Sequence, residues 1–138
     1  MKPSVLRLLT TLLLLVGSSR VGAQTITLSS GSAGTLVINA AIPGQNPTSA
    51  SASSTTYAVT TPAPPGTYRI TASINQTMPA GTTLRLSMAA PASATSLGAV
   101  ALTTTAQNVV INIPRKTNGT SLAITYTFDA TPAAGVVP

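Results

Sequence analysis

Residues 67–75 read Thr-Tyr-Arg-Ile-Thr-Ala-Ser-Ile-Asn, and polar and apolar side chains alternate through the whole stretch. Its even-numbered residues are apolar and its odd-numbered residues are polar. A period of two is typical of a β-strand that buries one face and exposes the other. Residues 83–88 (Thr-Leu-Arg-Leu-Ser-Met) repeat this pattern and place Arg85 on the polar face. These two segments predict half-buried strands.

Similar strand-like runs continue outward along the chain in both directions. They cover residues 25–29, 35–42, 56–60, 97–104, 108–113 and 122–128. Turn-forming residues separate several of them, at Pro64-Pro65-Gly66, Pro79-Ala80-Gly81 and Asn118-Gly119. After residue 23 no segment has the length and spacing of an amphipathic helix. The pattern predicts an all-β fold of antiparallel strands, arranged as a sandwich or a barrel.

The four aromatic residues after residue 23 are Tyr57, Tyr68, Tyr126 and Phe128. Tyr57 is in phase with the aliphatic Val59, and the others are in phase with aliphatic neighbours as well. Carbohydrate-binding modules usually present exposed tryptophan or tyrosine rings, and this chain has no tryptophan. We therefore expect the rings to pack in the core, and a glycan-binding module remains a distant alternative.

Residues 1–23 have the pattern of a secretory signal peptide. Lys2 and Arg7 supply positive charge, and an apolar run follows over residues 8–16. Small residues then precede Gln24, which predicts cleavage after Ala23. The apolar run is shorter than the roughly 20 residues of a membrane-spanning helix. The expected location is secreted, periplasmic or on the cell surface, with no membrane span in the mature chain.

The expected mature chain, residues 24–138, is short enough to form one domain. Residues 45–55 contain only small or polar side chains apart from one proline, so we expect a flexible Ser/Thr-rich loop there. We expect residues 130–138 to form a frayed tail.

The composition excludes most catalytic chemistry. The chain has no His and no Cys, and Asp129 is its only carboxylate. Paired acids, thiolate nucleophiles, zinc sites and carboxylate calcium cages therefore cannot form. Lys116 is the only lysine after the leader, and it falls in a predicted hairpin turn, where a lysine is solvated and unsuited to act as a base. We predict no enzymatic activity, no catalytic residues, no metal and no cofactor.

The positive charge does not predict nucleic-acid binding. Three of the seven cations belong to the leader, and residues 24–138 carry a formal charge of +3. The remaining cations, Arg69, Arg85, Arg115 and Lys116, are scattered along the chain. Phosphate backbones are usually bound by clustered Lys and Arg together with aromatic stacking platforms. We therefore expect no nucleic-acid partner.

The segment from Tyr68 to Phe128 resembles bacterial exported immunoglobulin-like domains, including small surface proteins and fimbrial-type subunits. The stretches that carry the resemblance are Tyr-Arg-Ile-Thr-Ala-Ser-Ile, Pro-Ala-Gly-Thr-Thr-Leu-Arg-Leu-Ser-Met, Gly-Ala-Val-Ala-Leu-Thr-Thr-Thr-Ala-Gln-Asn-Val-Val and Leu-Ala-Ile-Thr-Tyr-Thr-Phe. The resemblance implies an immunoglobulin-like β-sandwich of about seven or eight short strands. It also implies a non-enzymatic structural or interaction protein of the cell surface or extracellular space.

Domains of this kind usually end with a further strand, and this sequence stops where that strand would begin. We therefore expect an open sheet edge at which the protein pairs with itself or with another surface protein. The alternating residues Thr25, Ile26, Thr27 and Leu28 would form a donor strand for another chain. In that alternative the protein is a fimbrial-type polymerising subunit. Pairing of the same residues within their own domain is the simpler possibility.

Overall fold

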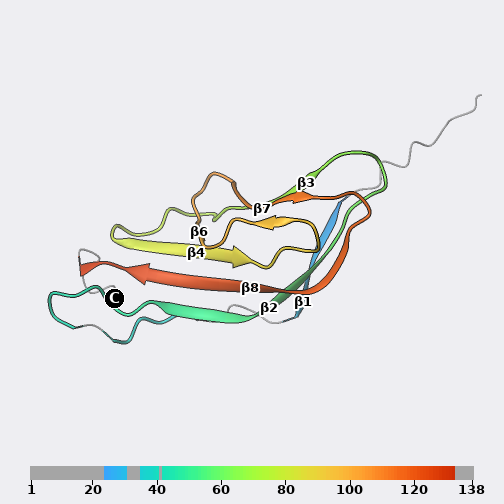
Figure 1. Ribbon diagram of the computed structural model, residues 1–138. Helices are drawn as coiled ribbons and strands as arrows, with labels where there is room; N and C mark the ends of the chain where they lie inside the picture. The colour runs from blue at the N-terminus through green and yellow to red at the C-terminus, as the bar shows by residue number, and fades with distance from the viewer. Residues whose placement is uncertain (1–23, 31–34, 41, 133–138) are drawn as a thin grey trace, which may run out of the picture.

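The long strand β8 (Asn118–Ala130) lies at the centre of the larger of two sheets in this computed structural model (Figure 1). The structure describes residues 24–30, 35–40 and 42–132. β8 pairs antiparallel with β2 (Ala50–Thr60) on one side and with β4 (Thr82–Met88) on the other. β1 (Thr25–Ser30) pairs with β2, and β6 (Val100–Ala101) pairs with β4. The strand order of this five-stranded sheet is β1-β2-β8-β4-β6.

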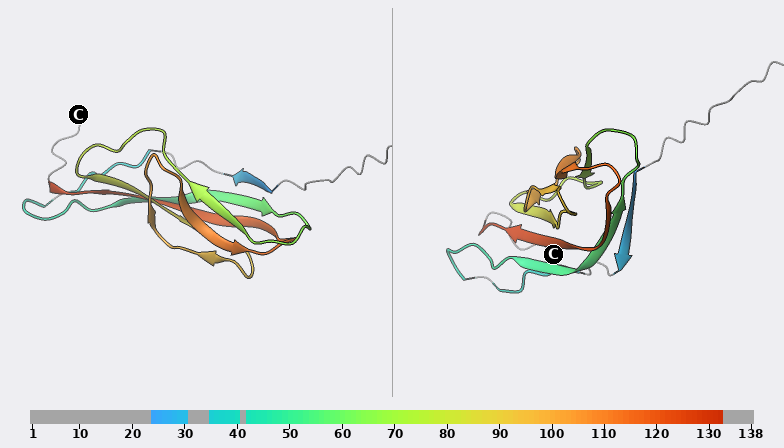
Figure 2. Two further views of the ribbon diagram at one scale, coloured as in Figure 1. Left: turned by 90° about the horizontal axis from the view of Figure 1, so that it is seen from above. Right: turned by 45° about the vertical axis from the view of Figure 1, so that its right-hand side comes forward.

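The smaller sheet has β7 (Gln107–Ile113) at its centre. β3 (Tyr68–Ala72) pairs with one side of β7, and the two-residue β5 (Thr95–Ser96) pairs with the other. All of these pairings are antiparallel. The two sheets face one another, as the right-hand view of Figure 2 shows. The predicted all-β fold with antiparallel strands is confirmed, and it is sandwich-like.

The core lies between the inner faces of the two sheets. Its fully or almost fully buried members are Tyr57, Val59, Ile70, Leu86, Met88, Leu102, Val109, Val110, Ile113 and Ile124. Tyr68, Ala72 and Ile74 pack against this cluster, as the alternation of residues 67–75 predicts. Arg85 lies on the exposed face of β4, also as predicted. Burial of these aliphatic side chains on one face of each strand is the main force that holds the sheets together.

β7 departs from strict alternation. Val109 and Val110 are adjacent in sequence, and both are completely buried. The register between β3 and β7 shifts twice, and Asn112 has a positive φ of 57°. Irregularities of this kind change the face to which the following side chains point. The predicted strand over residues 108–113 is therefore present, but its inward positions do not follow from its sequence period.

Three segments differ from the sequence-based expectation. Residues 35–40 and Ile42 lie outside any strand, although residues 35–42 were expected to form one. The chain turns just after Ile42, where the Gln45 N–H donates to the Ile42 carbonyl (3.0 Å), and the Thr48 N–H donates to the Ala40 carbonyl (3.1 Å). Residues 97–104 hold only β6, and β5 ends just before them. Asn118 and Gly119 belong to β8 rather than to a turn, because the chain reverses earlier, at residues 114–117.

The segment predicted as a loop is shorter in the structure. β2 begins at Ala50, so only residues 45–49 of the expected loop 45–55 precede the strand. Ala50 and Ala52 lie opposite Phe128 and Tyr126 of β8. Backbone pairing with a central strand therefore orders this part, even though its side chains are too small to order it by burial. At the other end β8 extends through Ala130, the first residue of the predicted tail. The predicted signal peptide and residues 133–138 of that tail lie outside the described residues.

Candidate functional site

The residues predicted as a donor strand form β1 at one margin of the five-stranded sheet. Thr25, Ile26, Thr27 and Leu28 lie opposite Thr60, Val59, Ala58 and Tyr57 of β2 in the same chain. Within the described residues β1 has one neighbouring strand, so its other side carries a row of backbone groups without a strand partner. Figure 2 shows β1 in blue at the margin of the ribbon. Donation of this strand to another chain stays a prediction.

The apolar side chains of β1 point to the core side of the sheet but remain open to solvent. Directly opposite residues of an antiparallel pair project to the same face. Ile26 therefore shares a face with Val59, and Leu28 shares a face with Tyr57. Val59 and Tyr57 are completely buried, whereas Ile26 is 47% and Leu28 is 67% exposed. The core therefore covers these β2 side chains and leaves Ile26 and Leu28 of β1 largely open.

One contact ties the start of β1 to the smaller sheet. The side-chain amide of Gln24 donates a hydrogen bond to the backbone carbonyl of Arg69 in β3 (3.4 Å). β3 is itself a marginal strand, with β7 as its neighbour. The two sheets therefore approach one another at the first residue of the described chain. Leu28, farther along β1, is the more exposed of its two apolar residues.

Residues 24–30 lack the sequence features that usually protect a marginal strand. Natural edge strands are shielded by charged side chains, by proline, by strong bulges or by a covering segment. Residues 24–30 read Gln-Thr-Ile-Thr-Leu-Ser-Ser and contain no charged residue and no proline. A register shift occurs only near the end of the strand, between Leu28 and Ser30. The arrangement suits pairing with a further strand.

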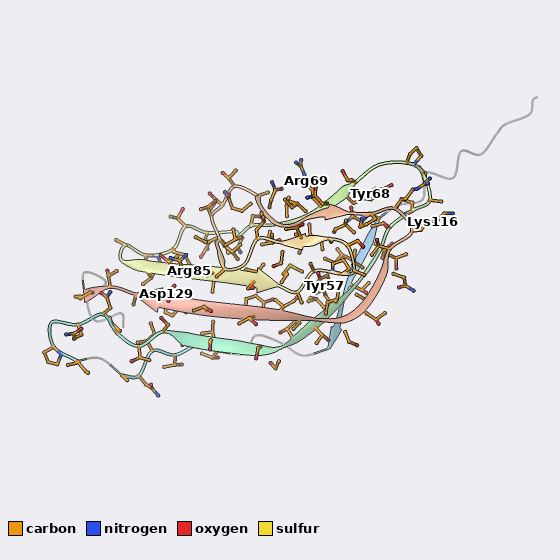
Figure 3. The ribbon with its side chains drawn as sticks, in the orientation of Figure 1. Tyr57, Tyr68, Arg69, Arg85, Lys116 and Asp129 are labelled. Atoms are coloured by element: carbon orange, nitrogen blue, oxygen red, sulfur yellow. The ribbon has the colours of Figure 1, made fainter. Side chains whose placement is uncertain are left out.

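The one carboxylate lies far from this edge, where its role is structural. Asp129 in β8 accepts hydrogen bonds from the Ser49 hydroxyl (2.5 Å) and from the Arg85 guanidinium (2.8 Å). Figure 3 shows Arg85 and Asp129 together near one end of the molecule. The hydrogen bond from Ser49, and then the one from Arg85, lower the pKa of Asp129. The contacts link β4, β8 and the chain just before β2.

Lys116 lies at the other end of the molecule (Figure 3). It is exposed and has a positive φ of 57°, in the turn between β7 and β8. Its backbone N–H donates to the Pro62 carbonyl (3.1 Å). The prediction that Lys116 occupies a hairpin turn is thus confirmed. The structure does not bring Lys116 and Asp129 together.

Tyr57 takes the core position that its phase with Val59 predicts. Its ring is completely buried, and its hydroxyl donates to the Ala89 carbonyl (2.5 Å). Burial raises the pKa of the Tyr57 hydroxyl above its usual value. This ring is therefore no stacking platform for a ligand, and its hydroxyl fastens the chain after β4 to β2.

Two shallow hollows are lined by residues outside β1. One, of about 330 Å³, is lined by Ile74, Met78 and Leu102 and by several threonines. Two of those threonine hydroxyls already donate to backbone carbonyls, Thr82 to Pro79 and Thr103 to Thr105. The other hollow, of about 360 Å³, lies beside Arg69, Asn108 and Asn112. Neither hollow contains a buried charged group that would orient a ligand.

The described part of the chain holds no cluster of three or more His, Cys, Asp or Glu side chains. Within the same residues no helix is long and apolar enough to cross a membrane. Comparison with protein-family models, with curated proteins and with solved structures finds no match. Among the described residues, the apolar edge of β1 is the candidate binding surface that combines exposed apolar side chains with unpaired strand backbone.

Proposed function

We propose that this chain is a non-enzymatic exported protein of the cell surface or extracellular space that works by strand pairing at the edge of β1. The observation that carries this proposal is the exposure of Ile26 and Leu28 on an uncharged marginal strand. A strand added beside β1 would pair with its outer backbone groups and cover both side chains. The leader-like residues 1–23 support export.

Within the sandwich-like class we further propose an immunoglobulin-like architecture. Two facing antiparallel sheets with one shared core support it. The likeness does not extend to the strand order, because the last described strand, β8, lies in the same sheet as β1 and β2. Constant-type immunoglobulin domains place their last strand in the other sheet.

A fimbrial-type subunit that donates β1 to the next copy is a second candidate. It is favoured by the small area that β1 buries in its own chain, since Leu28 is 67% exposed. Release of β1 from β2 would break the backbone hydrogen bonds between the two strands, but it would expose little apolar surface that is now buried. A polymer formed in this way would appear as a series of oligomers of increasing mass, because each copy donates a strand and receives one.

The proposed function is tested by expressing the complete chain and following its location. We expect the protein in the exported fraction, with an intact mass that begins at Gln24. The Ile26→Lys and Leu28→Lys double variant should be exported at the same level but released from the cell surface into the medium. Leu97→Lys is the matched control, because Leu97 is 45% exposed and lies outside β1. Recovery of an uncleaved cytoplasmic protein, or equal retention of all three proteins, would contradict the proposal.

A further inference from the structure

The sequence of β1 is complementary to itself when two copies run antiparallel. If Thr27 lies opposite Thr27 of a second copy, Ile26 of each chain lies opposite Leu28 of the other. Opposite residues project to the same face, so the four exposed apolar side chains would form one cluster. If Ile26 lay opposite itself instead, Leu28 would lie opposite the polar Gln24. The register centred on Thr27 therefore gives the largest apolar contact.

We propose that two copies of this protein pair through their β1 strands about a two-fold axis at Thr27. This inference rests on the proposed function, since it uses the same free edge and identifies the partner as a second copy. The two five-stranded sheets then join into one continuous sheet. Because each copy uses the same edge, the contact closes on itself and yields a dimer rather than a filament.

Charge and polar contacts agree with this pairing. The cations at positions 69, 85, 115 and 116 all lie outside β1, so the paired strands bring no like charges face to face. On the other face of the sheet, Thr27 of one copy would meet Thr27 of the other. Hydroxyl pairs of this kind are favourable neighbours across antiparallel strands. Backbone groups on the outer side of each β1 would find partners without any movement of β1 away from β2.

Single cysteines test the register, because the natural chain contains none. In the Thr27→Cys variant the two cysteines lie directly opposite one another, at a separation that a disulfide spans. Thr25→Cys is the matched control on the same strand and the same face. Its two copies lie four residues apart along the strands, or about 14 Å, and a disulfide spans at most about 7 Å.

Under mild oxidation we expect Thr27→Cys to form covalent dimers at least about tenfold faster than Thr25→Cys. Equal rates for the two variants would overturn the inference, because they would indicate random collision. The unmodified protein should have the mass of a dimer in light scattering at about 100 µM. Leu28→Lys should halve that mass, whereas Leu97→Lys should leave it unchanged.

The outcomes separate this inference from the proposed function. If the protein is monomeric and Thr27→Cys does not cross-link, while the lysine double variant still leaves the cell surface, the partner is a different protein. The dimer is then wrong and the proposed function stands. A ladder of masses that survives Leu28→Lys would favour strand donation and would also exclude the dimer. Circular dichroism of each variant confirms that the strands remain.

Discussion

Ile26 lies directly opposite Val59 in the ladder between β1 and β2, yet Val59 is completely buried and Ile26 is 47% exposed. Both side chains project from the same face of the sheet. The difference therefore arises from the extent of the core, which includes Val59 and ends before Ile26. An apolar residue on the core side of a strand is usually covered, so this open margin is the basis of the binding role and of the dimer that we propose.

Thr55 offers a test of the core itself. Its side chain is 1% exposed, and its hydroxyl has no hydrogen-bond partner in the structure. A buried hydroxyl without a partner costs about 1–3 kcal/mol of desolvation. Thr55→Val replaces the hydroxyl with a methyl group of similar size. We expect the free energy of unfolding to rise by about 1 kcal/mol, measured by urea denaturation. A clear loss of stability would indicate that the hydroxyl is satisfied, for example by a buried water.

Thr61 should respond to the same substitution in the opposite direction. It is also buried, but its hydroxyl donates to the Pro114 carbonyl (2.7 Å) and accepts from the Thr117 N–H (2.8 Å). Thr61→Val leaves both backbone groups without this partner. We expect a loss of about 1–3 kcal/mol in the free energy of unfolding. Equal effects of Thr55→Val and Thr61→Val in the same denaturation series would contradict this assignment.

Gly119 lies where β8 packs closely against its neighbours. A β-carbon added there would lie 2.9 Å from Leu122 Cδ1 and 3.0 Å from the Pro91 Cβ atom. The leucine methyl can rotate away, but the proline ring is rigid. We expect Gly119→Ala to lower the free energy of unfolding by about 1–3 kcal/mol. The neighbouring Thr120→Ala, at an exposed position, should stay within about 0.5 kcal/mol in thermal melts. No loss from Gly119→Ala would mean that the β8 backbone shifts readily.

Stability should depend on pH only at the extremes. The pKa of Asp129 is lowered, so its contribution is complete above its usual pKa and is lost as the pH falls through the lowered value. The pKa of Tyr57 is raised, so its contribution is complete below about pH 10 and is lost as the pH rises through the raised value. Between about pH 5 and 9 no side chain in residues 24–138 has its usual pKa, so the melting temperature should stay flat.

Two conservative substitutions serve as controls for this pH profile. Asp129→Asn should remove most of the dependence of the melting temperature on acid pH, and Tyr57→Phe should reduce its dependence on alkaline pH. The acid effect should be small, because the Arg85–Asp129 pair is partly exposed and surface ion pairs contribute about 0–1 kcal/mol. Melting temperatures measured by circular dichroism at acid and at alkaline pH test the two expectations. A change of many degrees between pH 5 and 9 would point to a bound ion.

The alternation of polar and apolar residues predicted a strand best where its pairing with the neighbouring strands has no register shift, as in β4. β4 spans Thr82–Met88, close to the expected residues 83–88, and it keeps Arg85 outside and Leu86 inside. The prediction failed where backbone pairing rather than side-chain character decides. Ala50–Ala52 form a strand because β8 pairs with them, whereas Val37 remains exposed despite its apolar neighbours. The pairing of Ala50–Ala52 and the exposure of Val37 both depend on segments that are distant in the sequence, so a short stretch of sequence does not reveal them.

The candidate site could be predicted only in part for the same reason. The period of two in residues 25–28 predicted a strand, and the structure places that strand at a sheet margin. Its donation to another chain stays a prediction. The exposure of Ile26 and Leu28 could not be derived from their sequence, because it depends on how far the core formed by distant segments extends. The hydrogen bonds around Thr61 were also missed, because their partners lie more than 50 residues away along the chain.

The amino-acid sequence by itself determined most of the strand-forming segments, their two-sided character and the lack of residues for acid–base or metal chemistry. These properties are local, since side-chain type and spacing specify them. The tertiary structure alone decided that β8 lies between β2 and β4 and that β1 is left at an open margin. Sheet order and coverage depend on pairing between distant segments, and many pairings satisfy the same local alternation.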